Sequence, residues 1–143
     1  MDIKTSNQGI KKRIDTLNEE AWRVRVHDSP RAFALSSESV QLAREAVYPK
    51  GLAEGLRSQG FGCIRLSKYE EALPLLKEAL SLFESLNDLR GQAVIYEYLG
   101  IIERNWGHLG QSLGLLLRAL DLSRQTGFTE NESTNCYQVG VTY

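Results

Sequence analysis

The stretch GFGCIRLSKYEEALPLLKEAL, residues 60–80, decides how the rest of the chain folds. It predicts the end of one helix, a tight turn filled by Tyr69, and a second helix that runs back antiparallel to the first. The small residues Gly60 and Ala72 allow the two helix backbones to approach closely. Apolar residues recur at helical spacing on one face of the second helix: Leu73, Leu76, Ala79 and Leu80. Because this hairpin leaves an apolar face uncovered, it needs neighbours of its own kind.

Those neighbours lie forty residues before and after the hairpin. Positions forty apart carry matching residues in six sets: Glu20, Gly60, Gly100 and Gly140; Ala32, Ala72 and Ser112; Ser39, Ala79 and Ala119; Leu35, Leu75 and Leu115; Val40, Leu80 and Leu120; Leu42, Leu82 and Leu122. Self-similarity at a fixed period is the signature of an array of helical hairpins. The first unit departs from the pattern, because Glu20 stands where the later units have glycine.

One pattern of residues resembles the tetratricopeptide repeat. It consists of a small residue followed by Tyr, Ala, Leu, Ala and Leu, which here are Gly60, Tyr69, Ala72, Leu76, Ala79 and Leu80. The resemblance covers nearly the whole chain. It implies an all-α fold, a right-handed superhelix (an α-solenoid) of antiparallel helix pairs with about seven helices. The family period is about 34 residues, so a forty-residue period implies that both helices of each pair are longer than usual.

Turn-forming residues divide the chain into a tail and successive units. We expect a flexible N-terminal tail at residues 1–9 and an array at residues 10–143, with units at 10–47, 50–87 and 88–127 and a partial unit at 128–143. The last residues repeat the middle of an earlier first helix, yet no second helix follows. We therefore expect a fragment that is cut inside its fourth unit, and a homodimer that covers the exposed C-terminal edge.

Several residues are predicted to begin, bend or end helices. The predicted caps are Ser29 ahead of Pro30, Ser67 in a capping box with Glu70, Asp88, and Thr129 in a capping box with Glu132. Gly107 and Gly127 are expected to end helices in the left-handed conformation. Pro74 lies inside a predicted helix and should bend it mildly.

Composition excludes several classes of function. The net charge is −1, so no strong field attracts nucleic acid or an anionic membrane. No apolar run approaches the ~18 residues of a membrane span, and the polar start lacks a signal-peptide core. We therefore expect a cytoplasmic location. Cys63 and Cys136 share no metal-binding spacing, and we expect both to be buried, inert thiols.

The sequence contains no catalytic signature, so we predict that the chain is not an enzyme and that it uses no cofactor or metal. His27 and His108 are far apart in sequence, and each is best explained as a surface residue near a helix end. The adjacent Glu70 and Glu71 fall in the first turn of a helix, where they compensate the helix dipole.

Any function should lie on the concave wall that first helices line in the tetratricopeptide family, where protein or peptide ligands bind. The resemblance places these candidate partner-binding residues on that wall: Arg57, Phe61, Ile64, Arg65, Glu97, Tyr98, Ile101 and Arg104. It adds Ile14, Leu17 and Val24 from the first unit. An apolar strip flanked by arginines suits an amphipathic peptide with an acidic side. In the alternative interpretation, the strip is core and the arginines pair with Glu54, Glu97 and Glu103.

Residues 15–56 also resemble the start of sensory tetratricopeptide segments in bacterial histidine kinases, diguanylate cyclases and nucleotide cyclases. This resemblance implies a non-catalytic, peptide-binding regulatory module of a larger signalling protein. The alternative is a static scaffold for a multiprotein complex, which transmits no signal. A catalytic domain downstream of Tyr143 would favour the first interpretation, and further repeats would favour the second.

Overall fold

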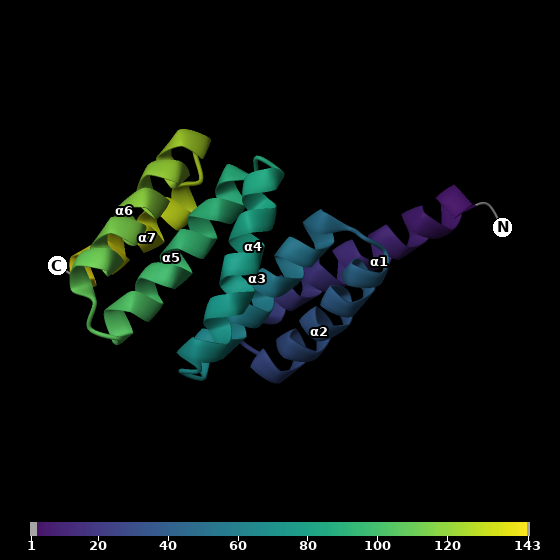
Figure 1. The fold of residues 1–143 in the computed structure, drawn as a ribbon, viewed down its shortest axis with the longest axis horizontal. Helices are drawn as coiled ribbons and strands as arrows, with labels where there is room; N and C mark the ends of the chain where they lie inside the picture. Colours follow the sequence, from purple (N-terminus) through teal and green to yellow (C-terminus); the bar gives the residue numbers. More distant parts are fainter. Residues whose placement is uncertain (1–2, 143) are drawn as a thin grey trace. The chain divides into compact units, whose positions relative to one another are not determined.

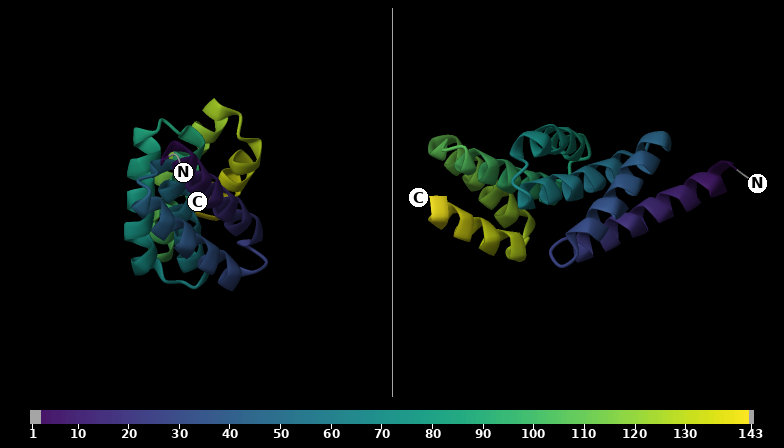
Figure 2. Two further views of the ribbon diagram at one scale, coloured as in Figure 1. Left: turned by 90° about the vertical axis from the view of Figure 1, so that its right-hand side faces the viewer. Right: turned by 90° about the horizontal axis from the view of Figure 1, so that it is seen from below.

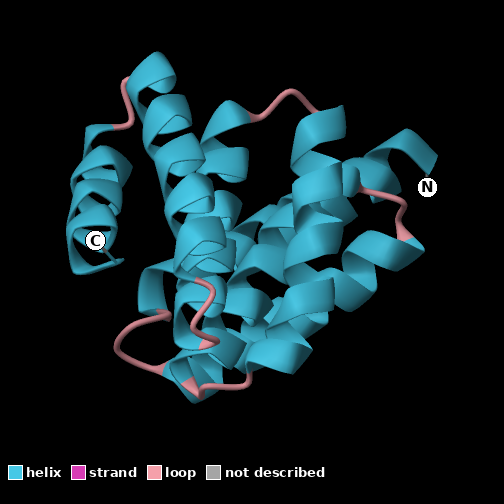
Figure 3. Cartoon of the chain, turned by 60° about the vertical axis from the view of Figure 1, so that its left-hand side comes forward, coloured by secondary structure: helices cyan, strands magenta, loops and turns pink. Residues whose placement is uncertain are grey.

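The structure, a computed structural model, describes residues 3–142, which form seven helices joined by short loops (Figure 1). The helices are α1 (Ile3–Val24), α2 (Ser29–Glu45), α3 (Pro49–Arg65), α4 (Tyr69–Ser85), α5 (Leu89–Asn105), α6 (Leu109–Thr126) and α7 (Thr129–Thr142). Over these residues only helices and loops are present (Figure 3). The predicted all-α helical-repeat fold is therefore confirmed, while the handedness of the superhelix stays a prediction.

The helices follow one another at a constant step. From α2 onward they begin at positions 29, 49, 69, 89, 109 and 129, a step of twenty residues. Each of the helices α2 to α5 has 17 residues, which leaves loops of three residues between them. A pair of helices therefore repeats every forty residues, and the extra length relative to the family period lies in the helices.

The loops repeat as regularly as the helices do. One residue with a positive φ follows each helix from α2 to α6: Val47 (51°), Ser67 (58°), Asn87 (54°), Gly107 (83°) and Gly127 (68°). In the first of these loops the amide of Tyr48 donates to the carbonyl of Ala43 at 2.9 Å, and the four later loops have the equivalent bond. This is the Schellman motif, which satisfies carbonyls at the helix end. The predicted left-handed glycines are confirmed.

These loops displace three of the predicted caps. The side chain of Asp28, not of Ser29, caps α2 by accepting from the amide of Arg31 at 3.2 Å. Ser67 provides the left-handed residue of its three-residue loop, so it lies two positions ahead of α4 and the predicted capping box is wrong. Thr129 is already the first residue of α7. The predicted cap Asp88 is confirmed, because it accepts from Gly91 at 2.9 Å.

The first helix begins earlier than the sequence suggested. α1 starts at Ile3, so residues 3–9, which we assigned to a flexible tail, are helical. Extending an existing helix adds one hydrogen bond for each residue fixed and so costs little once the helix has formed. Met1 and Asp2 lie outside the described residues, and a tail at those positions stays a prediction.

The chain forms two compact units, one that ends at Leu82 and one that begins at Phe83. In the first unit α1 packs against α2, α2 against α3, and α1 against α3 (Figure 2). In the second unit α5, α6 and α7 form the same three pairings. Each unit therefore contains the two helices of one pair together with the first helix of the following pair.

The second helix of every pair buries the same four positions. These are Ala32, Ser36, Ser39 and Ala43 in α2; Ala72, Leu76, Ala79 and Phe83 in α4; and Ser112, Leu116, Ala119 and Ser123 in α6. None of the twelve side chains is more than 6% exposed. The forty-residue repeat is therefore a repeat of the core itself, and Leu73 and Leu80 are half-buried beside that core.

The repeated glycines mark places where two helices touch. A Cβ atom at Gly60 would lie 2.4 Å from Cδ2 of Leu76, and one at Gly100 would lie 2.7 Å from Cγ of Leu116. In the first repeat Glu20 stands at the glycine position and Ser36 at the leucine position, so the larger residue is on the other helix. Glu20 is half-buried, and its carboxylate pairs with Arg31 of α2 at 2.7 Å.

The two cysteines differ in their surroundings. Cys63 is 7% exposed, as predicted, and burial raises the pKa of its thiol. Cys136, however, is exposed, so the expectation that it is buried is wrong. It follows the fully buried Asn135, and one residue turns a helix by about 100°, which directs Cys136 away from the packed face.

Candidate partner-binding wall

In the first unit α1 and α3 lie side by side and run in the same direction. Contacts join Asn18 to Gly51, Asp15 to Lys50 and Trp22 to Arg57, which are 33, 35 and 35 positions apart. Such a nearly constant separation is typical of parallel helices. We call the residues along this seam the first wall: Lys11, Asp15, Trp22 and Arg25 from α1, and Lys50, Glu54, Arg57, Phe61 and Arg65 from α3.

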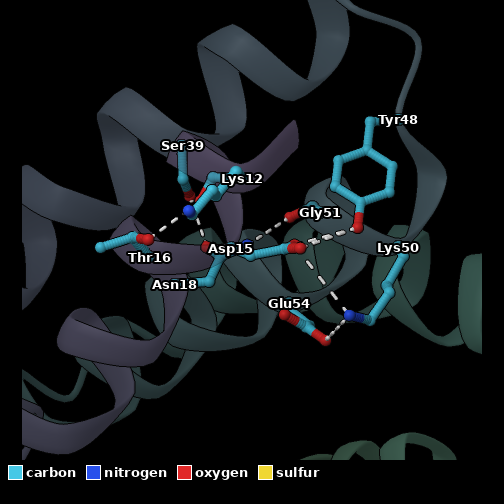
Figure 4. Close-up of polar contacts among 9 residues, drawn as sticks. All are labelled: Lys12, Asp15, Thr16, Asn18, Ser39, Tyr48, Lys50, Gly51 and Glu54. Carbon is cyan, nitrogen blue, oxygen red and sulfur yellow. Dashed lines mark hydrogen bonds and ion pairs between the residues drawn. The ribbon is translucent and has the colours of Figure 1, made fainter. Parts of the chain in front are cut away.

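One end of the first wall is a network of carboxylates, a lysine and a tyrosine (Figure 4). The hydroxyl of Tyr48 donates to Asp15 at 3.0 Å, and Nζ of Lys50 lies 4.0 Å from Asp15 and 3.9 Å from Glu54. Desolvation, with the bond to Asp15, raises the pKa of Tyr48 to about 12. Lys11 lies over the Tyr48 ring, 5.3 Å from its centroid. This end is internally balanced in charge.

A buried asparagine beneath the network fixes the spacing of the helices. Asn18 is 2% exposed, accepts from the hydroxyl of Ser39 at 2.6 Å and donates to the carbonyl of Gly51 at 3.0 Å (Figure 4). It therefore joins α1 to both α2 and α3. Because all three helices meet at one polar side chain, the first wall has a defined geometry.

The other end of the first wall alternates guanidinium groups with aromatic rings. The sequence of groups in space is Arg57, Trp22, Arg25, Phe61 and Arg65. The guanidinium carbons of Arg57 and Arg25 lie 3.8 Å and 3.7 Å from the Trp22 centroid. Those of Arg25 and Arg65 lie 5.6 Å and 5.8 Å from the Phe61 centroid. We call these five residues the cation–aromatic ladder.

Trp22 separates two positive charges by a fixed distance. Two guanidinium carbons within 3.8 Å of one ring centroid cannot share a face without overlapping, so Arg25 and Arg57 cover opposite faces of the indole. They are therefore about 7.5 Å apart, the sum of the two centroid distances. Stacking uses the flat face of a guanidinium, so the N–H groups at its edge can still donate hydrogen bonds.

Arg25 and Arg65, like Arg90, Arg104 and Arg118, meet their charge differently from the ion-paired arginines of residues 3–142. Elsewhere Arg13 pairs with Glu38, Arg44 with Glu78 at 2.8 Å and Arg124 with Glu132 at 2.9 Å. Over residues 3–142, neither Arg25 nor Arg65 forms an ion pair with a carboxylate. Arg25 donates to the carbonyl of Trp22 at 2.5 Å, while its buried Nε has no hydrogen-bond partner.

In the second unit α5 and α7 form an equivalent parallel pair, which we call the second wall. Asn131 donates to the Glu97 carboxylate at 2.8 Å, and Arg104 donates to the side chain of Gln138 at 2.6 Å. Both contacts join residues 34 positions apart. Glu97 is 5% exposed and Tyr98 6% exposed, while Ile101 and Arg104 are half-buried. This wall is held together by its own amide hydrogen bonds.

A buried polar cluster supports the second wall from α6. The hydroxyl of Ser123 donates to Oδ1 of Asn131 at 2.6 Å, and Nδ2 of Asn135 donates to the same oxygen at 2.8 Å. Oδ1 of Asn135 is buried and has no hydrogen-bond partner. Ser123 and Asn131 occupy the positions that Phe83 and Gly91 fill forty residues earlier. The contact between these two positions is therefore apolar at Phe83 and Gly91 and polar at Ser123 and Asn131.

The structure assembles only part of the predicted site. It brings Arg57, Phe61 and Arg65 together, with Ile64 half-buried on the same helix. The placement of Ile14, Leu17 and Val24 on the wall is wrong, because at 0%, 9% and 7% exposure they form the core. That apolar stripe is the packed face of α1, so the wall lies beside it.

Trp22 and Arg25 belong to the cation–aromatic ladder but are not among the binding residues predicted from the sequence. They are spaced i, i+3, which places them on one helix face. An aromatic and a basic residue on one face, beside an apolar stripe, is the sequence pattern from which this part of the wall could have been predicted. Of the acidic residues in the alternative interpretation, Glu54 contacts Lys50, Glu97 accepts from Asn131, and Glu103 contacts His108 at 2.7 Å. Their pairing with the arginines stays an alternative.

A metal centre and a membrane span are two further kinds of site that a helical chain can contain. In the part of the chain that the structure describes, no group of three His, Cys, Asp or Glu residues could hold a metal ion. None of the helices between residues 3 and 142 combines the length and apolar character needed to cross a membrane.

Comparison with protein families gives one match. A family model described as the tetratricopeptide repeat matches residues 51–125, a little over half of the chain. The matched region begins at Gly51 in α3 and ends within α6, so it contains the hairpins at Gly60 and Gly100. No curated protein matches the sequence.

Proposed function

Because the chain belongs to the tetratricopeptide repeat family, whose members are protein-interaction modules, we propose that it works by binding a peptide segment of a protein partner rather than by catalysis. The observation that supports this proposal is the cation–aromatic ladder. Its guanidinium groups are backed by aromatic rings, and those of Arg25 and Arg65 are not neutralised by carboxylates of the described chain. A segment with an acidic side complements this surface.

The ligand we propose is amphipathic as well as acidic. Phe61 and Ile64 are half-buried, so a ligand side chain can bury apolar area against them. Ring stacking restricts the rotamers of Arg25 and Arg57 before the ligand arrives. Such preorganisation lowers the entropy lost when side chains are immobilised, about 0.5–1.5 kcal/mol for each one. The ladder therefore suits anionic groups better than a flexible lysine-rich surface does.

The test is a fluorescence anisotropy titration of the chain with a labelled acidic amphipathic peptide. Arg65→Gln should weaken binding about fivefold, which corresponds to ~1 kcal/mol for an exposed charge contact. The matched control is Arg118→Gln on α6, because Arg118 lies 5.8 Å from the Tyr96 centroid, as Arg65 does from Phe61. Equal losses in the two variants, or none in either, would contradict the proposed site.

The second wall enters the proposal in a smaller role. Ile101 and Arg104 are half-buried and can contact a ligand, whereas Glu97 and Tyr98 are buried and would support the wall from behind. Ile101→Ser and Glu97→Gln separate these roles. The first should change affinity with little change in melting temperature, and the second should lower the melting temperature.

We further propose that the module is the regulatory, sensory part of a larger bacterial signalling protein. The support is the resemblance of residues 15–56 to such segments. In the full-length protein, peptide binding should change the activity of the attached output domain. If the activity is unaffected while binding persists, the static scaffold is the better interpretation.

A homodimer through α7 is the remaining part of the proposal. Tyr137 and Val141 on this helix are 69% and 53% exposed, which is high for apolar side chains. Light scattering should show a dimer that Tyr137→Asp dissociates into monomers. The matched control is Leu117→Asp on α6, where the side chain is 48% exposed. A monomer at high concentration would contradict this part.

A further inference from the structure

We infer that the ladder recognises two acidic residues at alternate positions of an extended peptide, a Glu-x-Glu or Asp-x-Asp pair. This inference rests on the proposed function, because it specifies the chemistry of the peptide that the first wall binds. The key observation is the fixed placement of Arg25 and Arg57 on opposite faces of Trp22.

The spacing of the two guanidinium groups selects the spacing of the two acids. Arg25 and Arg57 are about 7.5 Å apart across the indole. In an extended chain, residues i and i+2 point to the same side and lie about 6.6–6.8 Å apart. Residues i and i+1 point to opposite sides, and residues i and i+4 lie about 13 Å apart. Only the alternate spacing presents one carboxylate to each guanidinium.

The hydrogen-bonding capacity of the arginines fits this arrangement. A guanidinium has five N–H donors and can bind a carboxylate through two of them. Arg25 uses Nη1 for the carbonyl of Trp22, which leaves donors at the edge of its stacked plane. Because both faces of Trp22 are covered by cations, the indole is not a stacking platform for the ligand. Trp22 is therefore a positioning residue, which holds the two binding groups apart.

Arg65 provides a third guanidinium group further along the wall. Its guanidinium carbon lies 5.8 Å from the Phe61 centroid, and that of Arg25 lies 5.6 Å from the same centroid. Arg65 is therefore at most about 11.4 Å from Arg25. A further acidic residue on the same side of the peptide gains a third contact, whereas the side chains between the acidic residues point away from the wall.

The test uses three isomeric octapeptides of the same composition. Their two glutamates are adjacent, separated by one residue, or separated by three residues. Anisotropy at low salt should give an affinity at least about tenfold higher for the Glu-x-Glu peptide than for the other two. Equal affinities would overturn the spacing inference and leave the proposed function intact. No binding by any peptide below about 1 mM would overturn the proposed function as well.

Substitution of the positioning residue separates spacing from charge. Trp22→Leu keeps both arginines, so it should preserve the attraction to glutamates but reduce the preference for Glu-x-Glu to less than about threefold. Trp106→Leu in the second unit, a tryptophan that is 38% exposed, is the matched control and should keep the full preference. A tenfold preference that survives in Trp22→Leu would overturn the inference. If circular dichroism shows that Trp22→Leu is unfolded, Arg25→Lys serves instead, because it keeps the charge and removes the guanidinium fork.

Discussion

The two walls are built from equivalent helices but hold their charged side chains in different ways. In the second wall Glu97 and Arg104 are bound by amides of α7, at 2.8 Å and 2.6 Å. In the first wall Arg25 and Arg65 rest on aromatic rings and form no ion pair with a carboxylate of residues 3–142. Hydrogen bonds to side-chain amides occupy the polar atoms of a charged side chain, whereas stacking on a ring leaves many of those atoms available. Under the proposed function, one repeat is specialised for stability and its equivalent for binding.

The largest effect should come from breaking the second wall. Asn131→Leu removes the amide that donates to the buried Glu97 carboxylate, and it should lower the free energy of unfolding by about 3 kcal/mol. Urea denaturation measures the change. The comparison is Asn135→Leu, which breaks the bonds that Asn135 donates to Asn131 and Ser123 but leaves the bond from Asn131 to Glu97, so the loss should be smaller, about 1 kcal/mol. If both variants lose the same stability, hydrogen bonding to Glu97 is not what holds this wall.

Two glycine substitutions should show that the units share one packing scheme beneath their different walls. Gly60→Ala and Gly100→Ala each place a Cβ within 2.7 Å of a buried leucine. Each should lower the free energy of unfolding by about 2 kcal/mol, because overpacking a tight core forces strain. Gly62→Ala and Gly114→Ala meet open space and should raise stability by up to about 1 kcal/mol through helix propensity. A gain in stability at Gly60 or Gly100 would refute the close approach.

The arginines of the two walls should respond differently to the same substitution. Arg104→Gln breaks the contact to Gln138 and should lower the free energy of unfolding by about 1.5 kcal/mol. Arg65→Gln removes an exposed side chain and should change it by less than about 0.5 kcal/mol. Thermal unfolding of the pair gives the comparison directly. The reverse order of effects would mean that the first wall, not the second, is the structural one.

The smallest effect concerns the polar end of the first wall and depends on pH. The pKa of Tyr48 is raised from 10.0 to about 12 in the folded chain, so the folded state favours the protonated phenol. Its contribution, ~1 kcal/mol for one hydrogen bond, is complete below pH 10 and is lost as the pH rises through 12. Tyr48→Phe should therefore be less stable than the parent chain at pH 8 and about equal to it near pH 12. A difference that does not change between these pH values would contradict the assignment.

The sequence predicted the fold well because the repeat is carried by the core. Gly60 with Leu76 and Gly100 with Leu116 form the same contact forty residues apart, so matching residues imply matching structure. Helix boundaries were less predictable. Ser67 has the right chemistry for a cap, but a three-residue loop needs it in the left-handed conformation.

The binding surface was harder to predict for a different reason. A wall lies where two helices meet, so its composition depends on the rotation of each helix about its own axis. The stripe of Ile14, Leu17 and Val24 indicated the packed face of α1 correctly, but the wall begins one face further round, at Trp22 and Arg25. The contacts of Trp22 with Arg57, 35 positions away, have no local signal in the sequence.

The central claim, that acidic segments bind at the cation–aromatic ladder of the first wall, can be tested by one NMR titration. The chain has two tryptophans, Trp22 in the first unit and Trp106 in the second, so their indole N–H resonances report on each unit separately. Addition of the Glu-x-Glu octapeptide should shift the Trp22 resonance in a saturable way and leave that of Trp106 unchanged. A saturable shift of Trp106 alone, or of neither resonance, would contradict the account.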